Sequence, residues 1–262
     1  MTKTVLRHGN VFFWGYGLIL LMVAMIMPPV AQSQLYHAFA NQRSFLGIPN
    51  FWDVVSNLPF LLIGAAGIIF LRHDKQRTRK TDSTSVHSAY QLVFLSTLLV
   101  FPSSAYYHWS PDNISLLWDR LPIAIGMMAL LAAVLLERIP LKRPNLLLII
   151  FVSLGAASVV YWYWSEQQGA GNLNYYIAVQ FGALLLVALL VGFYPSRYSR
   201  AHDLYGVLGW YGLAKIAEIF DEPIYQISGI VSGHTLKHLL AAMGVYWLIR
   251  MLRLRADSRK SA

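Results

Sequence analysis

The sequence predicts an all-α protein: a polytopic bundle of transmembrane helices that forms one integral membrane domain over residues 1–262. Hydrophobic residues make up 56% of the chain and charged residues only 13%, whereas soluble domains carry about 25% charged residues. The apolar residues fall into runs long enough to cross about 30 Å of hydrocarbon. Lys and Arg gather in alternate links between these runs, as expected of a multi-pass membrane protein.

Eight apolar runs are long enough to be membrane spans. They cover residues 11–31, 51–71, 90–109, 116–136, 145–164, 175–194, 204–222 and 232–251. The third run is interrupted by Pro102, and the seventh contains Lys215 and Glu218. These two runs are therefore the weakest of the eight.

The first run, 11–31, has two possible interpretations. Lys3 and Arg7 precede it and Ala31 could mark a cleavage point, as in a signal peptide. Its apolar stretch is longer than the usual core of such a peptide. We therefore expect a retained N-terminal helix.

The positions of the basic residues predict the orientation. Lys and Arg are concentrated at both termini and in the second, fourth and sixth links, whereas the alternate links hold one clear case, Arg43. Cytoplasmic links are enriched in basic residues, so both termini should be cytoplasmic. This bias also explains the formal net charge of +9. We find no nucleic-acid-binding module and expect no nucleic-acid partner.

The absence of cysteine restricts the chemistry. With no cysteine in the chain, a disulfide framework, an iron–sulfur cluster and a thiolate zinc site are excluded. Any bound metal must be held by His, Asp or Glu.

Four side chains suited to a metal site, His108, Asp119, His234 and His238, should lie in one layer near the outer surface. Ser104 and His108 are four residues apart at the end of the third run, and Asp119 lies near the start of the fourth. A short turn makes these two helices antiparallel neighbours. His234 and His238, also four apart, share one face at the start of the last run.

Three imidazoles and a water molecule complete the tetrahedral shell of a catalytic zinc site. A nearby carboxylate such as Asp119 can take a proton from that water, and a hydroxyl such as that of Ser104 can donate to an oxyanion. Each feature also has an ordinary explanation, since an HxxxH pair often reflects packing and Asp119 could form a surface ion pair with Arg120. Their combination at one depth favours a metal site without identifying the metal.

A second polar group lies beside this one. Lys215 and Glu218 are three residues apart in the seventh run and are expected to neutralise one another. Lys237, between the two late histidines, could pair with Glu218 or Asp221, or bind an anionic lipid head group.

At these residues the chain resembles the alkaline ceramidase family. That family belongs to a superfamily of seven-helix membrane hydrolases that also includes adiponectin-type receptors and Per1-like proteins. The shared signature is a Ser and a His four apart, an Asp early in the next span, and HxxxH in the final span. The second run adds the family's SN pair, Ser56 and Asn57, within FWDVVSNLPF. The resemblance extends from about residue 45 to 250.

The resemblance implies that His108, His234 and His238 bind Zn²⁺, with Asp119 and Ser104 close to the metal-bound water as the catalytic pair. It implies a zinc-dependent intramembrane hydrolase that cleaves the amide bond of ceramide-like membrane lipids, releasing a fatty acid and a sphingoid base. The seven family helices would correspond to the second to eighth runs, with 11–31 as an extra N-terminal helix.

Two departures narrow what the resemblance implies. Eukaryotic members carry an acidic calcium site before the first family helix, but the matching segment here has no acidic residue until Asp53, which puts calcium regulation in doubt. The stretch GIPNFWDVVSNLPF resembles the bacterial branch, which implies a bacterial inner membrane with the metal site toward the periplasm.

Many bacteria lack ceramide, so a lipid esterase or amidase with a non-sphingolipid substrate is an alternative, as is a non-enzymatic receptor or transporter. The oligomeric state cannot be read from the sequence.

Overall fold

The computed structural model describes residues 3–78 and 84–255, and it is a bundle of α-helices without a strand in that part of the chain. The predicted all-α bundle is thus confirmed. The elements are α1 (Lys3–Ile26), η1 (Gln34–His37), α2 (Phe51–Val55), α3 (Leu58–Thr78), α4 (Thr84–Trp109), α5 (Asn113–Leu136), α6 (Pro144–Gln167), α7 (Asn174–Phe193), α8 (Asp203–Ile219), α9 (Asp221–Ser228) and α10 (Gly233–Leu254).

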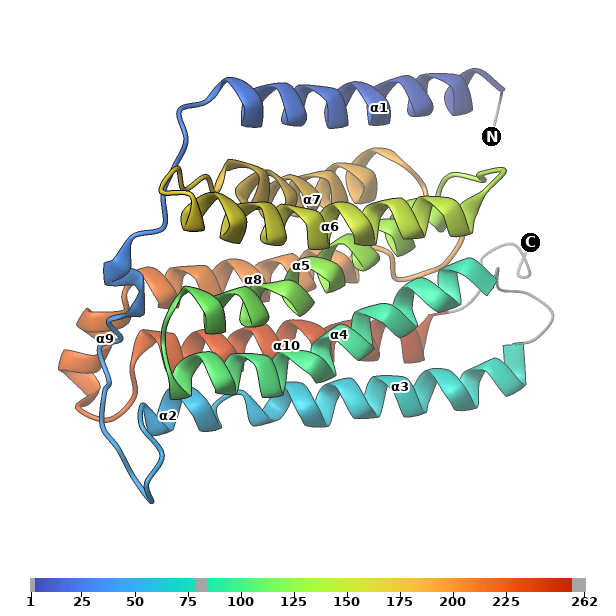
Figure 1. The fold of residues 1–262 in the computed structure, drawn as a ribbon. Coiled ribbons are helices and arrows are strands. Elements are labelled where there is room, and N and C mark those ends of the chain that lie inside the picture. Colours follow the sequence, from blue (N-terminus) through green and yellow to red (C-terminus); the bar gives the residue numbers. More distant parts are fainter. Residues whose placement is uncertain (1–2, 79–83, 256–262) are drawn as a thin grey trace.

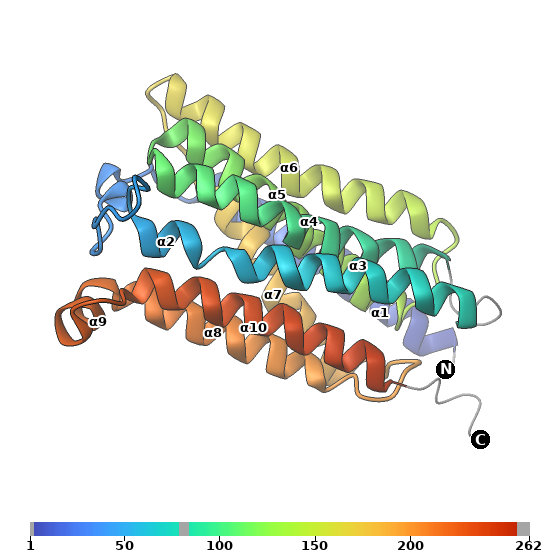
Figure 2. The same ribbon diagram turned by 90° about the horizontal axis from the view of Figure 1, so that it is seen from below.

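The long helices run side by side along one axis (Figure 1). In the view from below, α8 and α10 lie on one side of α3, and α4, α5 and α6 lie on the other (Figure 2). The start of α1 and the end of α10 lie at the same end of the bundle. This arrangement fits termini on one side of a membrane, while the cytoplasmic location of that side stays a prediction.

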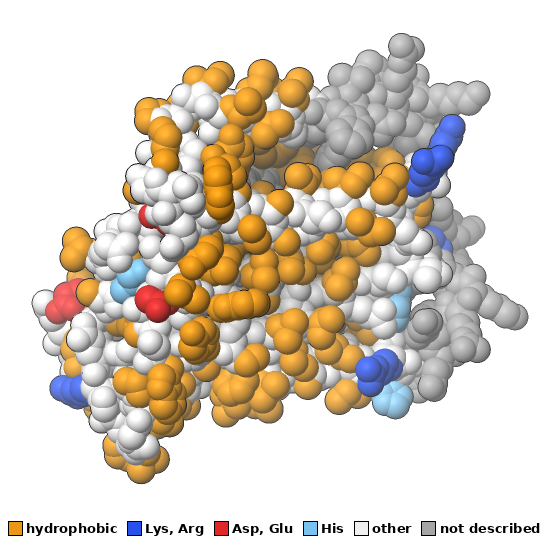
Figure 3. Space-filling model, viewed as in Figure 1, with side chains coloured by type: hydrophobic (Ala, Val, Ile, Leu, Met, Phe, Trp, Pro, Cys, Tyr) orange, Lys and Arg blue, Asp and Glu red, His pale blue; other side chains and the backbone are white. Residues whose placement is uncertain are grey.

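Five helical segments in the described part of the chain are long and apolar enough to cross a membrane. They are Phe51–His73, Thr84–Trp109, Asn113–Leu136, Pro144–Gln167 and Asn174–Phe193. Orange hydrophobic side chains cover the middle of the molecular surface, and blue basic side chains gather mainly at the end of the bundle where α1 starts (Figure 3). These features fit a multi-pass membrane protein.

The other three expected spans are less clear. Among the described side chains of α1, the apolar segment Gly15–Ile26 is shorter than a membrane span. α8 has only 17 residues, and α10 carries several charged and polar side chains. These helices lie alongside the other five (Figure 1), so the count of eight spans stays a prediction.

Two expected boundaries need correction. The first helix ends at Ile26 rather than at residue 31, because Pro28 and Pro29 cannot continue it. The expected span 204–222 ends at Ile219, and a separate short helix follows. The expected span 51–71 lies within the apolar segment Phe51–His73, in which a break at Ser56 and Asn57 separates α2 from α3.

A capped turn sets the geometry between α4 and α5. The Asp112 carboxylate accepts the Ser115 amide N–H at 2.6 Å, and the Ser115 hydroxyl accepts the Asp112 amide N–H at 3.0 Å. This reciprocal capping starts α5 after a link of only three residues, 110–112. The end of α4 and the start of α5 therefore lie next to each other.

Close helix contact depends on a glycine at one position in α3. A Cβ atom added at Gly64 would lie 2.6 Å from the backbone nitrogen of Leu98 in α4. Small residues allow helix backbones to approach in membrane bundles. A side chain here would push α3 away from α4.

A buried carboxylate links three helices at the end of the bundle opposite α9. Glu137 Oε1 accepts a hydrogen bond from the Tyr90 hydroxyl at 2.8 Å and from the Arg255 guanidinium at 2.5 Å. Arg138 Nη1 lies 3.6 Å from Glu137 Oε2. One carboxylate thus joins α4, the end of α5 and the end of α10.

Replacing Glu137 with glutamine is expected to destabilise the fold by about 3–5 kcal/mol, because buried guanidinium groups lose their counter-charge. The Asp203→Asn variant is the control, since Asp203 pairs with the more exposed Arg200 and such pairs contribute about 0–1 kcal/mol. Thermal unfolding of the purified variants in detergent measures both effects. Equal shifts in Tm for the two variants would contradict the expectation.

Candidate metal centre

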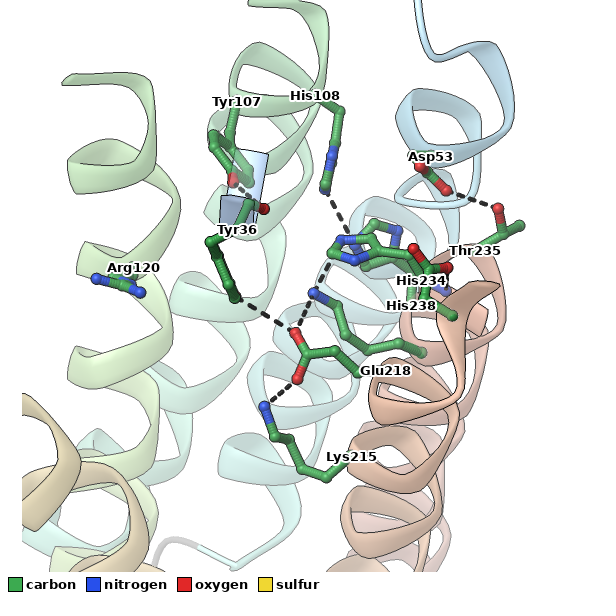
Figure 4. Close-up of polar contacts among 12 residues, drawn as sticks. Tyr36, Asp53, Tyr107, His108, Arg120, Lys215, Glu218, His234, Thr235 and His238 are labelled. Carbon is green, nitrogen blue, oxygen red and sulfur yellow. Dashed lines mark hydrogen bonds and ion pairs between the residues drawn. The ribbon is translucent and has the colours of Figure 1, made fainter. Parts of the chain in front are cut away.

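The structure brings together the three histidines that the sequence singled out. His108 lies in the last turn of α4, and His234 and His238 lie in the first two turns of α10. All three are buried, and one ring nitrogen from each lies within 4.8 Å of the others. Their rings converge from two helices (Figure 4).

The spacing of the ring nitrogens suits a divalent metal. The Nε2 atoms of His108 and His238 lie 3.2 Å apart. Two imidazole nitrogens that share a tetrahedral zinc ion at about 2.0–2.1 Å lie about 3.3–3.4 Å apart. The cluster therefore offers a donor set that could hold a metal ion, although the geometry does not identify the metal.

Ser56 fixes the orientation of the His238 ring. Its Oγ lies 2.7 Å from His238 Nδ1 and 3.2 Å from the carbonyl oxygen of Asp53. Because the hydroxyl donates its proton to the carbonyl, it accepts one from His238 Nδ1. The lone pair of His238 is then on Nε2, the nitrogen that faces His108. Such outer hydrogen bonds orient metal-binding imidazoles.

The third ring, His234, is engaged by Lys237. The Lys237 ammonium lies 2.9 Å from His234 Nε2 and 2.9 Å from Glu218 Oε1. A metal ion bound at His234 Nε2 would displace the ammonium from that nitrogen. The Glu218 carboxylate would still hold it nearby.

The second polar group is arranged largely as the sequence suggested. Glu218 forms ion pairs with both Lys215 and Lys237. Of the two partners considered for Lys237, the structure selects Glu218. Asp221 instead accepts the backbone N–H of His234 at 2.6 Å and that of Ala40 at 3.1 Å.

Asp119 and Ser104 form a buried pair beside the histidines. Both residues are buried, and Asp119 Oδ1 has no hydrogen-bond partner among the described residues. No hydrogen bond joins Asp119 to the three histidines in the described part of the chain. One carboxyl oxygen of Asp119 therefore stays free to accept a proton.

A largely apolar cavity of about 330 Å³ opens from this pair into the bundle. Ser104, Asp119 and His238 form part of its polar wall. The lining on α5 continues from Asp119 to Leu130, which corresponds to about 16 Å of helix rise. The volume lies within the range of ligand sites, about 300–1,000 Å³, and the length suits a long acyl chain.

Sequence reasoning missed three contributors to this site. Ser56 was identified only as part of a motif, and Tyr36, whose hydroxyl donates to Glu218 Oε1 at 3.3 Å, was not singled out. Arg120 was considered as a surface partner of Asp119, but both residues are buried, so that alternative is wrong. A charged residue within an apolar run was the available signal for Arg120.

Comparison of the chain with protein-family models and with curated proteins found no match.

Proposed function

We propose that this protein is a zinc-dependent intramembrane hydrolase that cleaves the amide bond of ceramide-like lipids into a fatty acid and a sphingoid base. The observation that carries the proposal is the cluster of three buried histidines with ring nitrogens within 4.8 Å of one another. The cluster contributes His238 to the polar wall of an apolar cavity that also contains a buried carboxyl group. Catalytic zinc sites use such a three-ligand set with one open position.

His108, His234 and His238 would hold the zinc ion, which would polarise the acyl carbonyl and lower the pKa of a water molecule toward neutral pH. Asp119 accepts the proton of the attacking water and then delivers it to the departing nitrogen. The water oxygen forms the new bond to the acyl carbon, and the carbon–nitrogen bond breaks. Ser104, which lines the same cavity as Asp119, would donate its hydroxyl proton to the developing oxyanion.

The cavity binds the acyl chain of the substrate. Apolar side chains including Val100, Leu130, Phe181 and Leu248 line it, and each CH₂ group buried contributes about 0.8 kcal/mol. Since most of this contact is remote from the reacting amide, the chain fixes the position of the acyl carbonyl relative to the histidines.

The purified protein in detergent should release fatty acid from a long-chain N-acyl sphingosine. Removing the metal with a chelator should abolish the release, and adding zinc should restore it. Protein that contains zinc but fails to hydrolyse any long-chain amide would contradict the proposal. Full activity after complete removal of metal would contradict the assigned role of zinc.

The Ser56→Ala variant is expected to bind zinc about 10–100-fold more weakly, because His238 loses the hydrogen bond that orients its ring. Ser103→Ala is the matched control, since the Ser103 hydroxyl bonds only carbonyl groups of its own helix. Competition with a metal indicator of known affinity measures the difference. Equal zinc affinities in the two variants would rule out the role of Ser56.

A further inference from the structure

A second charged feature in the cavity lies apart from the histidines. Arg120 follows Asp119 on α5, lines the cavity, and is only 6% exposed. It lies across the site from His234 and His238 (Figure 4). An anion bound to this guanidinium would therefore be distinct from a ligand of a metal in the histidine cluster.

The surrounding residues hold the guanidinium in a fixed orientation. Arg120 Nη2 donates to Gln32 Oε1 at 2.7 Å. The guanidinium carbon lies 4.2 Å from the ring centre of Trp162, 4.8 Å from that of Tyr176 and 5.5 Å from that of Tyr36. These cation–π contacts stabilise a buried positive charge without neutralising it.

One end of the guanidinium has no partner. Arg120 Nη1 is buried without a hydrogen bond, and no carboxylate forms an ion pair with Arg120 in the described part of the chain. Buried charges in membrane proteins are normally paired, and an unpaired buried donor is unfavourable. The free Nη1 donor therefore indicates a site for an acceptor supplied by a ligand.

The charges around the cavity also favour one negative ligand. Its charged lining residues are three cations and two carboxylates: Arg120, Lys215 and Lys237 against Asp119 and Glu218. Glu218 is engaged by both lysines. A carboxylate, with a single negative charge, would balance this surplus better than a phosphate with about −1.5 to −2.

We infer that Arg120 binds a carboxylate on the amine portion of a substrate, so that long-chain N-acyl amino acids are substrates of this site in addition to neutral ceramides. The identification of this ligand as a substrate rests on the proposed hydrolase function, but the anion site itself does not. The acyl chain occupies the apolar cavity, the amide carbonyl faces the histidine cluster, and the acidic group accepts from Arg120. The planar guanidinium fork matches the geometry of a carboxylate.

Two probes with the same acyl chain and amide isolate the effect of the carboxylate: N-hexadecanoylglycine and N-hexadecanoylethanolamine. Their binding is measured on the full-length protein in detergent with a chelator present, so that neither metal nor turnover contributes. The glycine conjugate is expected to bind about 10–100-fold more tightly, as for a hydrogen bond to a charged group. The same ratio is expected with zinc present.

Arg120→Gln should reduce this ratio to about one, and Arg120→Lys, which keeps the charge but loses the fork, should give an intermediate ratio. Arg43→Gln is the control, because Arg43 is exposed, donates to the carbonyl of Gly229 and does not line the cavity. It should leave the ratio unchanged. A variant that unfolds is recognised by its lowered Tm. If Arg120→Gln unfolds, the binding ratio is compared between Arg120→Lys and the unmodified protein instead.

Equal binding of the two probes to the unmodified protein would overturn the inference, as would a preference that survives Arg120→Gln. A preference seen only with zinc would place the carboxylate on the metal and overturn it equally. If the glycine conjugate binds preferentially but neither probe is hydrolysed by the zinc-loaded protein, the anion site stands and the hydrolase proposal fails.

Discussion

Replacing His238 with alanine is expected to remove zinc from the protein and to lower lipid-amide hydrolysis more than about a thousandfold. His238 Nε2 lies 3.2 Å from His108 Nε2, and His238 also lines the cavity. Loss of an outer hydrogen bond to a metal ligand already lowers affinity or activity by about 10–100-fold, so loss of the ligand itself should have a larger effect. Elemental analysis and a fatty-acid release assay on the same preparation measure both quantities.

His202→Ala is the matched control for this variant. His202 is exposed before α8 and its ring stacks on Tyr205, away from the cluster. The control should keep its zinc and its turnover. Retention of zinc and full turnover by His238→Ala, with the protein still folded, would refute the metal centre as described.

Replacing Asp119 with asparagine should lower turnover by about 10²–10⁴-fold, the usual contribution of general acid–base catalysis. The substitution preserves the size of the side chain and an oxygen that can accept from Ser104, but it removes the group that accepts the proton. Zinc content should be unchanged, because the three histidines supply the metal ligands. Steady-state hydrolysis with parallel metal analysis measures the two effects.

Asp112→Asn provides the control for Asp119→Asn. Asp112 caps α5 at the same end of the helix, and asparagine caps helices about as well as aspartate. Its activity should stay near that of the unmodified protein. If Asp119→Asn lost its zinc as His238→Ala is expected to, Asp119 would be a ligand. If Asp119→Asn kept full activity, Asp119 would not be the general base.

The convergence of the histidines could be predicted because it follows from local rules. His234 and His238 are four residues apart in a helix and so share a face. The alternation of basic residues predicted that this end of the last span and the end of the third lie on the same side. The short turn after His108 predicted that Asp119 would lie near the same end, as the capped turn at Asp112 now explains.

The partners of these residues could not be predicted, because they come from segments distant in the sequence. Ser56 reaches His238 only because α2 packs against the start of α10. The aromatic side chains around Arg120 come from η1, α6 and α7. No periodicity in the sequence encodes how these helices are placed around one another.

Two helix boundaries show a second limit of prediction from the sequence. Hydropathy extended the first span to residue 31, although Pro28 and Pro29 are strong local signals for an earlier end. The seventh run continued to residue 222, but the chain starts a new helix at Asp221, where the carboxylate accepts the backbone N–H of His234. Here a tertiary contact with α10 outweighs the continuity of the apolar run.

The most direct test of the metal centre is X-ray absorption spectroscopy at the zinc edge, performed on the purified full-length protein. We expect one zinc per chain with three imidazole nitrogens at about 2.0–2.1 Å. Any zinc that remains bound in His238→Ala should have one imidazole ligand fewer. Protein prepared with zinc in excess that binds no metal would contradict this centre. So would a zinc shell that is unchanged when His108, His234 and His238 are all replaced.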